Sequence, residues 1–199
     1  MTDFFDVVRS QRACRAFAPA PVDDATLARI LDAATYAPSA ENRQPWVFVV
    51  VRDAALRGHV HDLTQRAWED GGRDFATRRL TSGLLADVEH GIAGGGYRAA
   101  PVLVVVAADT DRCHPATVPA SIFPAVQNLC LAAQALGLGS ALTTLTTTFA
   151  VELGALLELP APVVAQAVVP VGHPARRLGP PRREPFAAHA FRDRFGVPW

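Results

Sequence analysis

The segment from Ile122 to Leu136 constrains the fold more than any other part of the chain, because it is apolar nearly all round. A helix with apolar side chains on every face is stable in water only when other elements surround it. Gly137 and Gly139 follow directly and indicate where this helix ends. They do not form a dinucleotide-binding fingerprint, since they follow a helix rather than a strand and Leu142 stands where the third glycine belongs. We therefore expect a central, fully buried helix.

Helix and strand patterns alternate along the rest of the chain, and Asp23 or Asp24 provides an N-cap for the clearest helix. The strands at 46–51 and 101–107 are expected to be buried on both faces. Three consecutive glycines predict a flexible break at 91–96, and prolines predict a loop at 109–120. The expected helices cover residues 3–9, 22–36, 53–69, 74–90 and 149–157, and the expected strands cover 46–51, 101–107, 140–144 and 163–171. Because helices outnumber strands, the pattern predicts an α+β or α/β fold with a modest sheet.

Beyond Gly172 the chain becomes rich in proline and arginine and loses its periodicity. A tail of this kind is either disordered or laid across another surface. The aromatic residues Phe191, Phe195 and Trp199 favour the second alternative, because exposed aromatic side chains need a partner. We expect one domain over residues 1–199, with an extended arm from about residue 174 to 199.

Composition excludes several classes of protein. The chain has 199 residues, half of them hydrophobic, and a formal net charge of zero, so there is no general attraction to nucleic acid or to an anionic membrane. The apolar run Ala99–Ala108 is too short to span a bilayer, and the first residues lack the pattern of a signal peptide. Three cysteines without framework spacing fit a reducing cytoplasm. All 19 basic residues are arginine, which suggests a bacterial genome and means that any phosphate is held by guanidinium groups.

The loop between residues 37 and 46 is unusually polar for a connection from a helix to a buried strand. It offers the amide side chains of Asn42 and Gln44 and the hydroxyl of Ser39, and it is stiffened by Pro38 and Pro45. Such a set of donors and acceptors suits a flat heterocycle. The alternative is a capped loop whose side chains only bind its own backbone.

Two further clusters carry the same ambiguity. Arginines at positions 9, 12 and 15, and a second set at 176–177 and 182–183, could form a phosphate cradle or a solvated basic patch. The threonines at 143–148 follow a predicted strand, where α/β proteins place ligands. High β-propensity, with Thr148 as an N-cap, is the alternative interpretation.

The sequence contains no evident nucleophile, general base or metal site. Cys113 and His114 lack a second pair at metal spacing, and His59 and His61 lie on different faces of a helix. Cys14 lies between two arginines and is either a candidate thiolate or a small apolar filler. If the protein is an enzyme, a cofactor is therefore expected to carry the chemistry.

Four motifs, in the right order, resemble signatures of the FMN-dependent nitroreductase family. Arg-Ala-Cys-Arg-Ala-Phe at 12–17 resembles its Arg-Ser-x-Arg-x-Phe motif, and residues 37–46 resemble its Ala-Pro-Ser-x-x-Asn-x-Gln-Pro-Trp loop. Residues 125–140 are similar to its central helix. Residues 171–174, followed by Arg-Arg-Glu-Pro at 182–185, resemble its Gly-Tyr-Pro strand end and its closing basic motif. Together the motifs span essentially the whole chain.

This resemblance implies an α+β nitroreductase-like fold, with a central mixed sheet surrounded by helices, and an intertwined homodimer with FMN at each end of the interface. Arg12, Arg15 and Arg183 would hold the phosphate and ribityl chain, and Arg15 would also stabilise negative charge near flavin N1 and O2. Thr143 and Thr144 would offer backbone N–H groups near flavin N5 and O4.

The partner subunit would contribute Ser39, Asn42 and Gln44 at the flavin edge. The full set of cofactor-binding positions that the resemblance implies is Arg12, Ala13, Cys14, Arg15, Pro38, Ser39, Asn42, Gln44, Thr143, Thr144, Arg182 and Arg183. Ala13 replaces the usual serine of the family, and His173 stands where tyrosine is common.

The implied activity is that of a cytoplasmic NAD(P)H oxidoreductase that passes electrons through FMN to a nitroaromatic, a quinone or a similar small acceptor, with ping-pong kinetics. No protein side chain is expected to act as an essential acid or base. Other reactions on the same scaffold remain open, namely dehydrogenation, dehalogenation and flavin fragmentation. A non-catalytic protein that stores or senses FMN or a deazaflavin is the alternative from another class.

Overall fold

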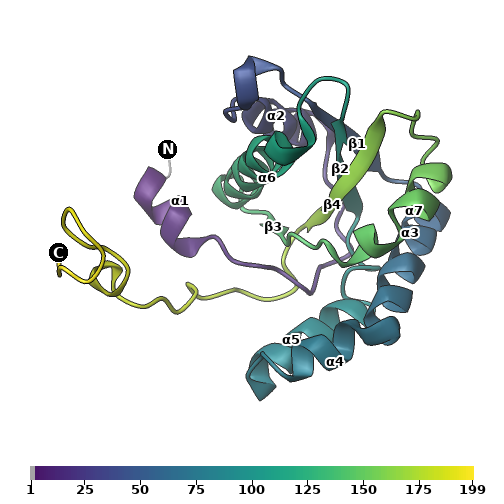
Figure 1. Ribbon diagram of the computed structural model, residues 1–199. Coiled ribbons are helices and arrows are strands. Elements are labelled where there is room, and N and C mark those ends of the chain that lie inside the picture. Colours follow the sequence, from purple (N-terminus) through teal and green to yellow (C-terminus); the bar gives the residue numbers. More distant parts are fainter. Residues whose placement is uncertain (1–2) are drawn as a thin grey trace.

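A computed structural model describes residues 3–199; Met1 and Thr2, which belong to the start sequence considered above for a signal peptide, lie outside the described residues. Figure 1 shows one sheet with helices on both faces and a C-terminal arm that leaves the body on the side of α1. This confirms the predicted α+β class. The elements are α1 (Phe4–Ser10), α2 (Asp24–Thr35), η1 (Ala40–Asn42), β1 (Trp46–Val51), α3 (Ala54–Ala67), η2 (Trp68–Gly72), α4 (Arg73–Thr77), α5 (Ser82–Ile92), β2 (Val102–Asp109), η3 (Pro115–Thr117), α6 (Val118–Ala135), β3 (Gly139–Ser140), η4 (Leu145–Phe149), α7 (Ala150–Leu156), β4 (Val163–Gly172) and η5 (Phe186–Ala188).

The sheet has the strand order β1-β2-β4-β3, and each of its pairings is antiparallel. The resemblance implied a mixed sheet, and this expectation is wrong for the named strands. Parallel pairing occurs at an isolated bridge between Ala13 and Ser140. β2 is buried over residues 102–108, as expected. β1 is an edge strand, so Trp46 to Val50 are only half-buried, which corrects the prediction of two buried faces.

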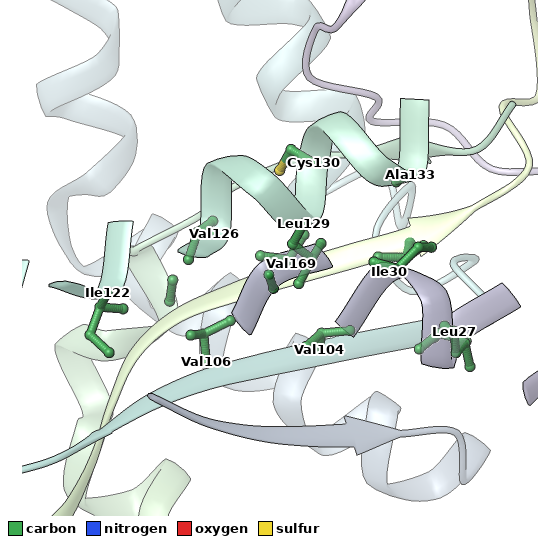
Figure 2. Close-up of a cluster of buried hydrophobic side chains, with 14 of the residues drawn as sticks. Leu27, Ile30, Val104, Val106, Ile122, Val126, Leu129, Cys130, Ala133 and Val169 are labelled. Carbon is green, nitrogen blue, oxygen red and sulfur yellow. The ribbon is translucent and has the colours of Figure 1, made fainter. Parts of the chain in front are cut away.

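Alternation along β2 places its side chains in two separate cores, because successive residues of a strand point to opposite faces. Val104 and Val106 pack on one face with α2 and α6, and Figure 2 shows them facing Ile122, Val126 and Leu129. Leu103 and Val105 belong to a second cluster with residues of α3 and α7. This two-sided packing fixes the sheet between two helical layers.

Helix α6 is the central helix, but it differs from the prediction in two ways. It begins at Val118, inside the expected loop 109–120, because Pro119 lies in its first turn, where a missing N–H costs nothing. Only one side is fully buried in the single chain, since Gln127 and Ala135 are exposed. By length and composition, Pro115–Ala135 is apolar enough to cross a membrane, with a mean hydropathy of 1.3, but it packs here as a core helix.

Four further differences lie between residues 53 and 144. The helix expected at 53–69 ends at Ala67, and a π-type turn follows in which Gly71 takes a φ of 121°. The helix expected at 74–90 is divided into α4 and α5 around residues 78–81. The glycines at 91–96 are not a loose break, because α5 runs to Ile92 and Gly91 and Gly96 are buried. The strand expected at 140–144 is paired only at Gly139–Ser140 and at an isolated bridge from Thr143.

The arm that follows β4 keeps its aromatic side chains exposed. The rings of Phe191 and Phe195 lie 4.7 Å apart, and those of Phe186 and Trp199 lie 6.3 Å apart. These contacts cover little surface, since Phe195 remains 92% exposed. The expectation that the arm packs on another surface stays a prediction.

Candidate functional site

The N-terminal arginine motif runs beside the start of the C-terminal arm. Residues between α1 and α2 are extended, and the Cys14 N–H donates to Ser140 O at 2.9 Å. Further along, the Ala18 N–H donates to His173 O at 2.8 Å, and the Ala175 N–H donates to Ala16 O at 3.0 Å. These backbone bonds bring the two basic clusters, far apart in sequence, to the same side of the molecule.

Between these clusters lies a cavity of about 540 Å³, which we call the arginine cavity. The Arg12 guanidinium is held by Gly179 O at 3.2 Å, and Arg183 donates to Arg182 O at 2.9 Å. Within residues 3–199, no carboxylate oxygen lies within 4.0 Å of Arg12, Arg182 or Arg183. Three guanidinium groups without an acidic partner favour a phosphate ligand. The lining residues are Gln11, Arg12, Ala13, Arg15, Thr81, Leu84, Pro180, Pro181, Arg182 and Arg183.

A second cavity, of about 640 Å³, has a largely apolar wall, and we call it the aromatic cavity. Trp68 and Phe75 come from the segment between α3 and α5, and Tyr97 follows α5. Thr143 and Thr144, which follow β3 much later in the sequence, also line this cavity. Its lining is Arg15, Ala67, Trp68, Asp70, Gly71, Gly72, Phe75, Ala76, Val88, Ile92, Tyr97, Leu142, Thr143, Thr144, Leu145 and Thr148.

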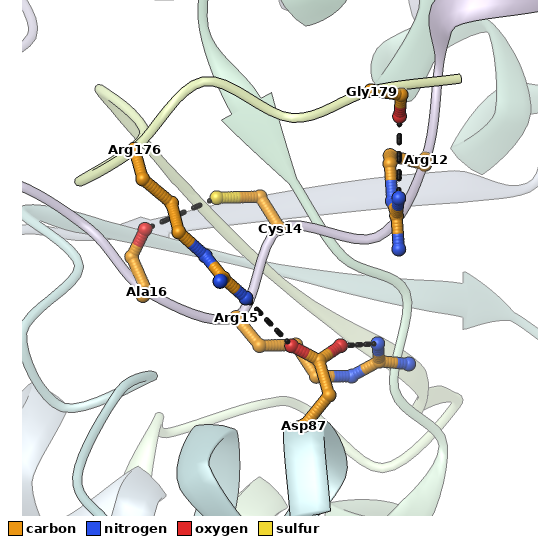
Figure 3. A network of polar contacts seen from close by, with 7 residues as sticks. All are labelled: Arg12, Cys14, Arg15, Ala16, Asp87, Arg176 and Gly179. Atoms are coloured by element: carbon orange, nitrogen blue, oxygen red, sulfur yellow. Dashed lines mark hydrogen bonds and ion pairs between the residues drawn. The ribbon is translucent and has the colours of Figure 1, made fainter. Parts of the chain in front are cut away.

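Arg15 lines both cavities and so joins them. Its Nη1 donates to Asp87 Oδ2 of α5 at 2.7 Å, as Figure 3 shows. A side chain at Gly91 would come within 3.0 Å of the Arg15 side chain, and one at Gly96 would overlap the Arg15 carbonyl oxygen. The two glycines therefore make room for Arg15. Burial raises the pKa of the neighbouring Tyr97, which keeps this phenol neutral.

The threonine loop offers fewer free backbone donors than the resemblance implied. The Thr143 N–H donates to Val168 O at 3.0 Å, so it is already used. In residues 3–199 the Thr144 N–H has no acceptor, and the Thr143 Oγ1 accepts from the Leu145 N–H at 3.2 Å. Thr144 N–H and the Thr143 hydroxyl are the groups left for a ligand.

Cys14 is a buried filler rather than a thiolate. Burial raises the pKa of its thiol, in spite of the neighbouring Arg15. Its Sγ lies 3.2 Å from Ala16 O, and a Cβ on Gly139 would come within 2.6 Å of the sulfur. The thiol therefore packs tightly against the glycine that follows α6.

The polar loop at 37–46 lines neither cavity. Glu41, Asn42 and Gln44 all take positive φ, between 49° and 53°, which is a strained conformation for these residues. Ser39 Oγ accepts from the Gln44 N–H at 3.0 Å, so the loop does bind its own backbone. The side chains of Asn42 and Gln44 remain exposed, beside exposed Pro38. Within the single chain, Asn42 and Gln44 are therefore not among the side chains that would contact a ligand in either cavity.

Sequence reasoning missed several residues of the site. Asp87, Tyr97, Trp68 and Phe75 lie in the region between α3 and β2, where no recognisable motif occurs. They carry no local sequence signal, because the packing of helices brings Trp68, Phe75 and Tyr97 to the aromatic cavity and Asp87 to Arg15. No three His, Cys, Asp or Glu side chains in residues 3–199 are grouped so that they could hold a metal ion.

Comparison with known proteins gives a consistent result. The family model described as Nitroreductase family matches residues 8–173. The chain is 37% identical to a 5,6-dimethylbenzimidazole synthase of Rhodospirillum rubrum, over 73% of this chain and 72% of that protein. It is 30% identical to an NADH dehydrogenase of Thermus thermophilus, over 88% and 89% of the two chains. A solved structure of oxidized iodotyrosine deiodinase, bound to FMN and 3-iodo-L-tyrosine, superposes with a TM-score of 0.73 at 26% identity, over 92% and 96%.

Proposed function

From the premise that the chain belongs to the nitroreductase family, we propose that it binds FMN across the arginine and aromatic cavities and works as an NAD(P)H oxidoreductase. One observation carries the proposal: a cavity with unpaired guanidinium groups joins an apolar cavity of similar size at Arg15. A phosphate and a flat ring on one ligand require this combination.

The residues present fit FMN. Arg12, Arg182 and Arg183, with the backbone N–H of Ala13, would hold the phosphate, because each guanidinium forms charge-assisted bonds to phosphate oxygens. Arg15, the Thr143 hydroxyl and the Thr144 N–H would face the ring from the wall of the aromatic cavity. Cys14 would support this wall through its backbone and packing only.

When bound, FMN supplies two-electron transfer between a nicotinamide donor and a small acceptor. The chain itself binds and orients: the apolar wall of Trp68 and Phe75 favours stacking of flat rings and excludes water. Arg15, which lines both cavities, would supply positive charge that stabilises negative charge on the bound group. Because the aromatic cavity offers a single apolar stacking site, donor and acceptor would occupy it in turn, which would give ping-pong kinetics.

We further propose that two chains form an intertwined homodimer. The half-buried edge of the sheet, the exposed side of α6 and the exposed aromatic side chains of the arm support this proposal. In the dimer, Pro38, Ser39, Asn42 and Gln44 of one chain would reach the cavity of its partner. The strained, outward-facing amides of this loop favour such a use.

Purified protein should be yellow, and NADH or NADPH should bleach it under anaerobic conditions. Initial rates with a quinone should give parallel double-reciprocal lines, and Cys14→Ser should retain most of the activity. Protein that takes up no FMN from a solution of the cofactor would refute the proposal. Intersecting lines, or loss of activity in Cys14→Ser with FMN bound, would refute the mechanism.

A second candidate is a different reaction on the same flavin scaffold, such as flavin fragmentation. The 37% identity to a 5,6-dimethylbenzimidazole synthase supports it. The two candidates differ on readmission of air to bleached protein. An electron-transfer enzyme recovers its full visible absorbance, whereas an enzyme that consumes its flavin loses it permanently.

A further inference from the structure

Three segments that are distant in sequence meet at Asp87. Arg15 Nη1 lies 2.7 Å from Asp87 Oδ2, and Arg176 Nη2, from the start of the C-terminal arm, lies 3.6 Å from Asp87 Oδ1. Figure 3 shows both guanidinium groups directed at the one carboxylate. The Arg15 and Asp87 side chains are only 18% and 25% exposed, so solvent screens this pair less than a surface ion pair.

The position of Arg15 leaves it little freedom. Gly91 and Gly96 allow the close approach of α5 and of the following turn to its side chain and backbone. Its Nε is buried and has no acceptor in the part of the chain that the structure describes. The direct bond to Asp87 is therefore the charged contact that orients the guanidinium at the junction of the two cavities.

The pair also sets the local charge. Asp87 lines neither large cavity, yet its negative charge lies beside the cation that does. A bound group that becomes more negative when it gains electrons is stabilised by Arg15, and Asp87 offsets part of that stabilisation. The strength of the offset is greatest where water is excluded.

We propose that Asp87 is a positioning residue that holds Arg15 between the cavities and lowers the reduction potential of the bound flavin by compensating the Arg15 charge. This inference rests on the proposed function, since it requires FMN in the site. It concerns a residue that none of the sequence motifs includes.

The test is the reduction potential of bound FMN in Asp87→Asn, measured by stepwise anaerobic reduction with dithionite against a reference dye. The asparagine carbonyl can still accept from Arg15 Nη1, so the geometry is kept while the negative charge is removed. We expect the affinity for reduced FMN, relative to oxidised FMN, to rise about tenfold, which raises the potential by about 30 mV for a two-electron couple.

Glu89→Gln is the matched control. Glu89 lies on the same helix, accepts from Arg73 Nε at 2.7 Å and lines neither cavity, so the substitution removes an equal charge from a nearby but more exposed ion pair. Its potential should stay at the wild-type value. Asp87→Glu, which keeps the charge, should also stay near that value and tests the idea if Asp87→Asn fails to fold.

The outcomes separate the two proposals. If wild-type protein binds FMN but the potential is unchanged or lower in Asp87→Asn, the inference about Asp87 is wrong and the proposed function stands. An equal rise in Glu89→Gln, or a tenfold rise in Asp87→Glu, also refutes it, because the effect would not depend on the Asp87 charge. Wild-type protein that binds no FMN would overturn both.

Discussion

The buried pair Thr64 and Thr146 should respond unequally to the loss of its two hydroxyls. Their Oγ1 atoms lie 2.7 Å apart and tie α3 to η4, the turn that follows the threonines of the aromatic cavity. The Thr64 Oγ1 also lies 3.0 Å from Val60 O. Each hydroxyl has one proton, so both are satisfied only if Thr146 donates to Thr64 and Thr64 donates to Val60 O.

The direction of this chain of bonds sets the size of each effect. In Thr146→Val, Thr64 still donates to Val60 O, so the loss is one hydrogen bond, about 1 kcal/mol. In Thr64→Val, the buried Thr146 hydroxyl has no acceptor left among residues 3–199, and the cost rises to about 2 kcal/mol. The double variant should lose no more than Thr64→Val alone, because no hydroxyl then remains unpaired.

Urea unfolding at a fixed protein concentration measures these free energies, since association with a partner would otherwise change them. The serine variants of Thr64 and Thr146 keep the hydroxyl and lose only a methyl group, so their costs should be similar to one another. Equal costs for the two valine variants, or a larger cost for Thr146→Val, would refute the assigned direction.

Three further predictions concern the cofactor, the arm and pH. Arg183→Glu should raise the FMN Kd roughly 100-fold or more, because a charge-assisted bond becomes a repulsion. Arg177→Glu, which lines neither large cavity, should change it less than about threefold. If FMN fluorescence titrations gave similar Kd values for these two variants, the assignment of Arg183 to the FMN phosphate would be wrong. A chain that ends before Phe191 should lose both self-association and FMN, and a flavin-bearing monomer in analytical ultracentrifugation would be the contrary result. Burial lowers the pKa of His61, so the unfolded chain binds the proton more readily and stability should fall from about pH 7 to about pH 5. In urea titrations His61→Gln should flatten this dependence, and exposed His59→Gln should keep it; an unchanged slope in His61→Gln would rule out His61 as the cause.

The parts of the fold with strong local signals were predictable from the sequence. Asp23 caps α2 as expected, because its carboxylate accepts from the Thr26 N–H at 2.8 Å. The continuous apolar run of β2 lies between two cores. The apolar run of β1 has the same appearance but lies at the sheet edge. Strand order depends on contacts across the whole chain, so a local pattern could not separate these two cases.

The candidate site was predictable only where it is carried by motifs. Arg12 and Arg183 lie together, as both basic clusters suggested. The pairing of Arg15 with Asp87 joins residues 72 positions apart and leaves no local signature. The resemblance led us to expect a free N–H at Thr143. This N–H is used in a bridge to Val168, and the bridge depends on a strand register that the sequence does not reveal.

The arginine cavity takes one wall from residues 11–15 and the other from residues 180–183. Synthesis runs from the N-terminus, so the residues of every strand described within 3–199 have been added once Gly172 is made, while the second wall is still missing. A nascent chain that stops at Gly179 therefore contains the whole sheet but not the cavity. The proposed capture of FMN would therefore need an almost complete chain, and copies that end at Gly179 would keep the strands while lacking one wall of the arginine cavity.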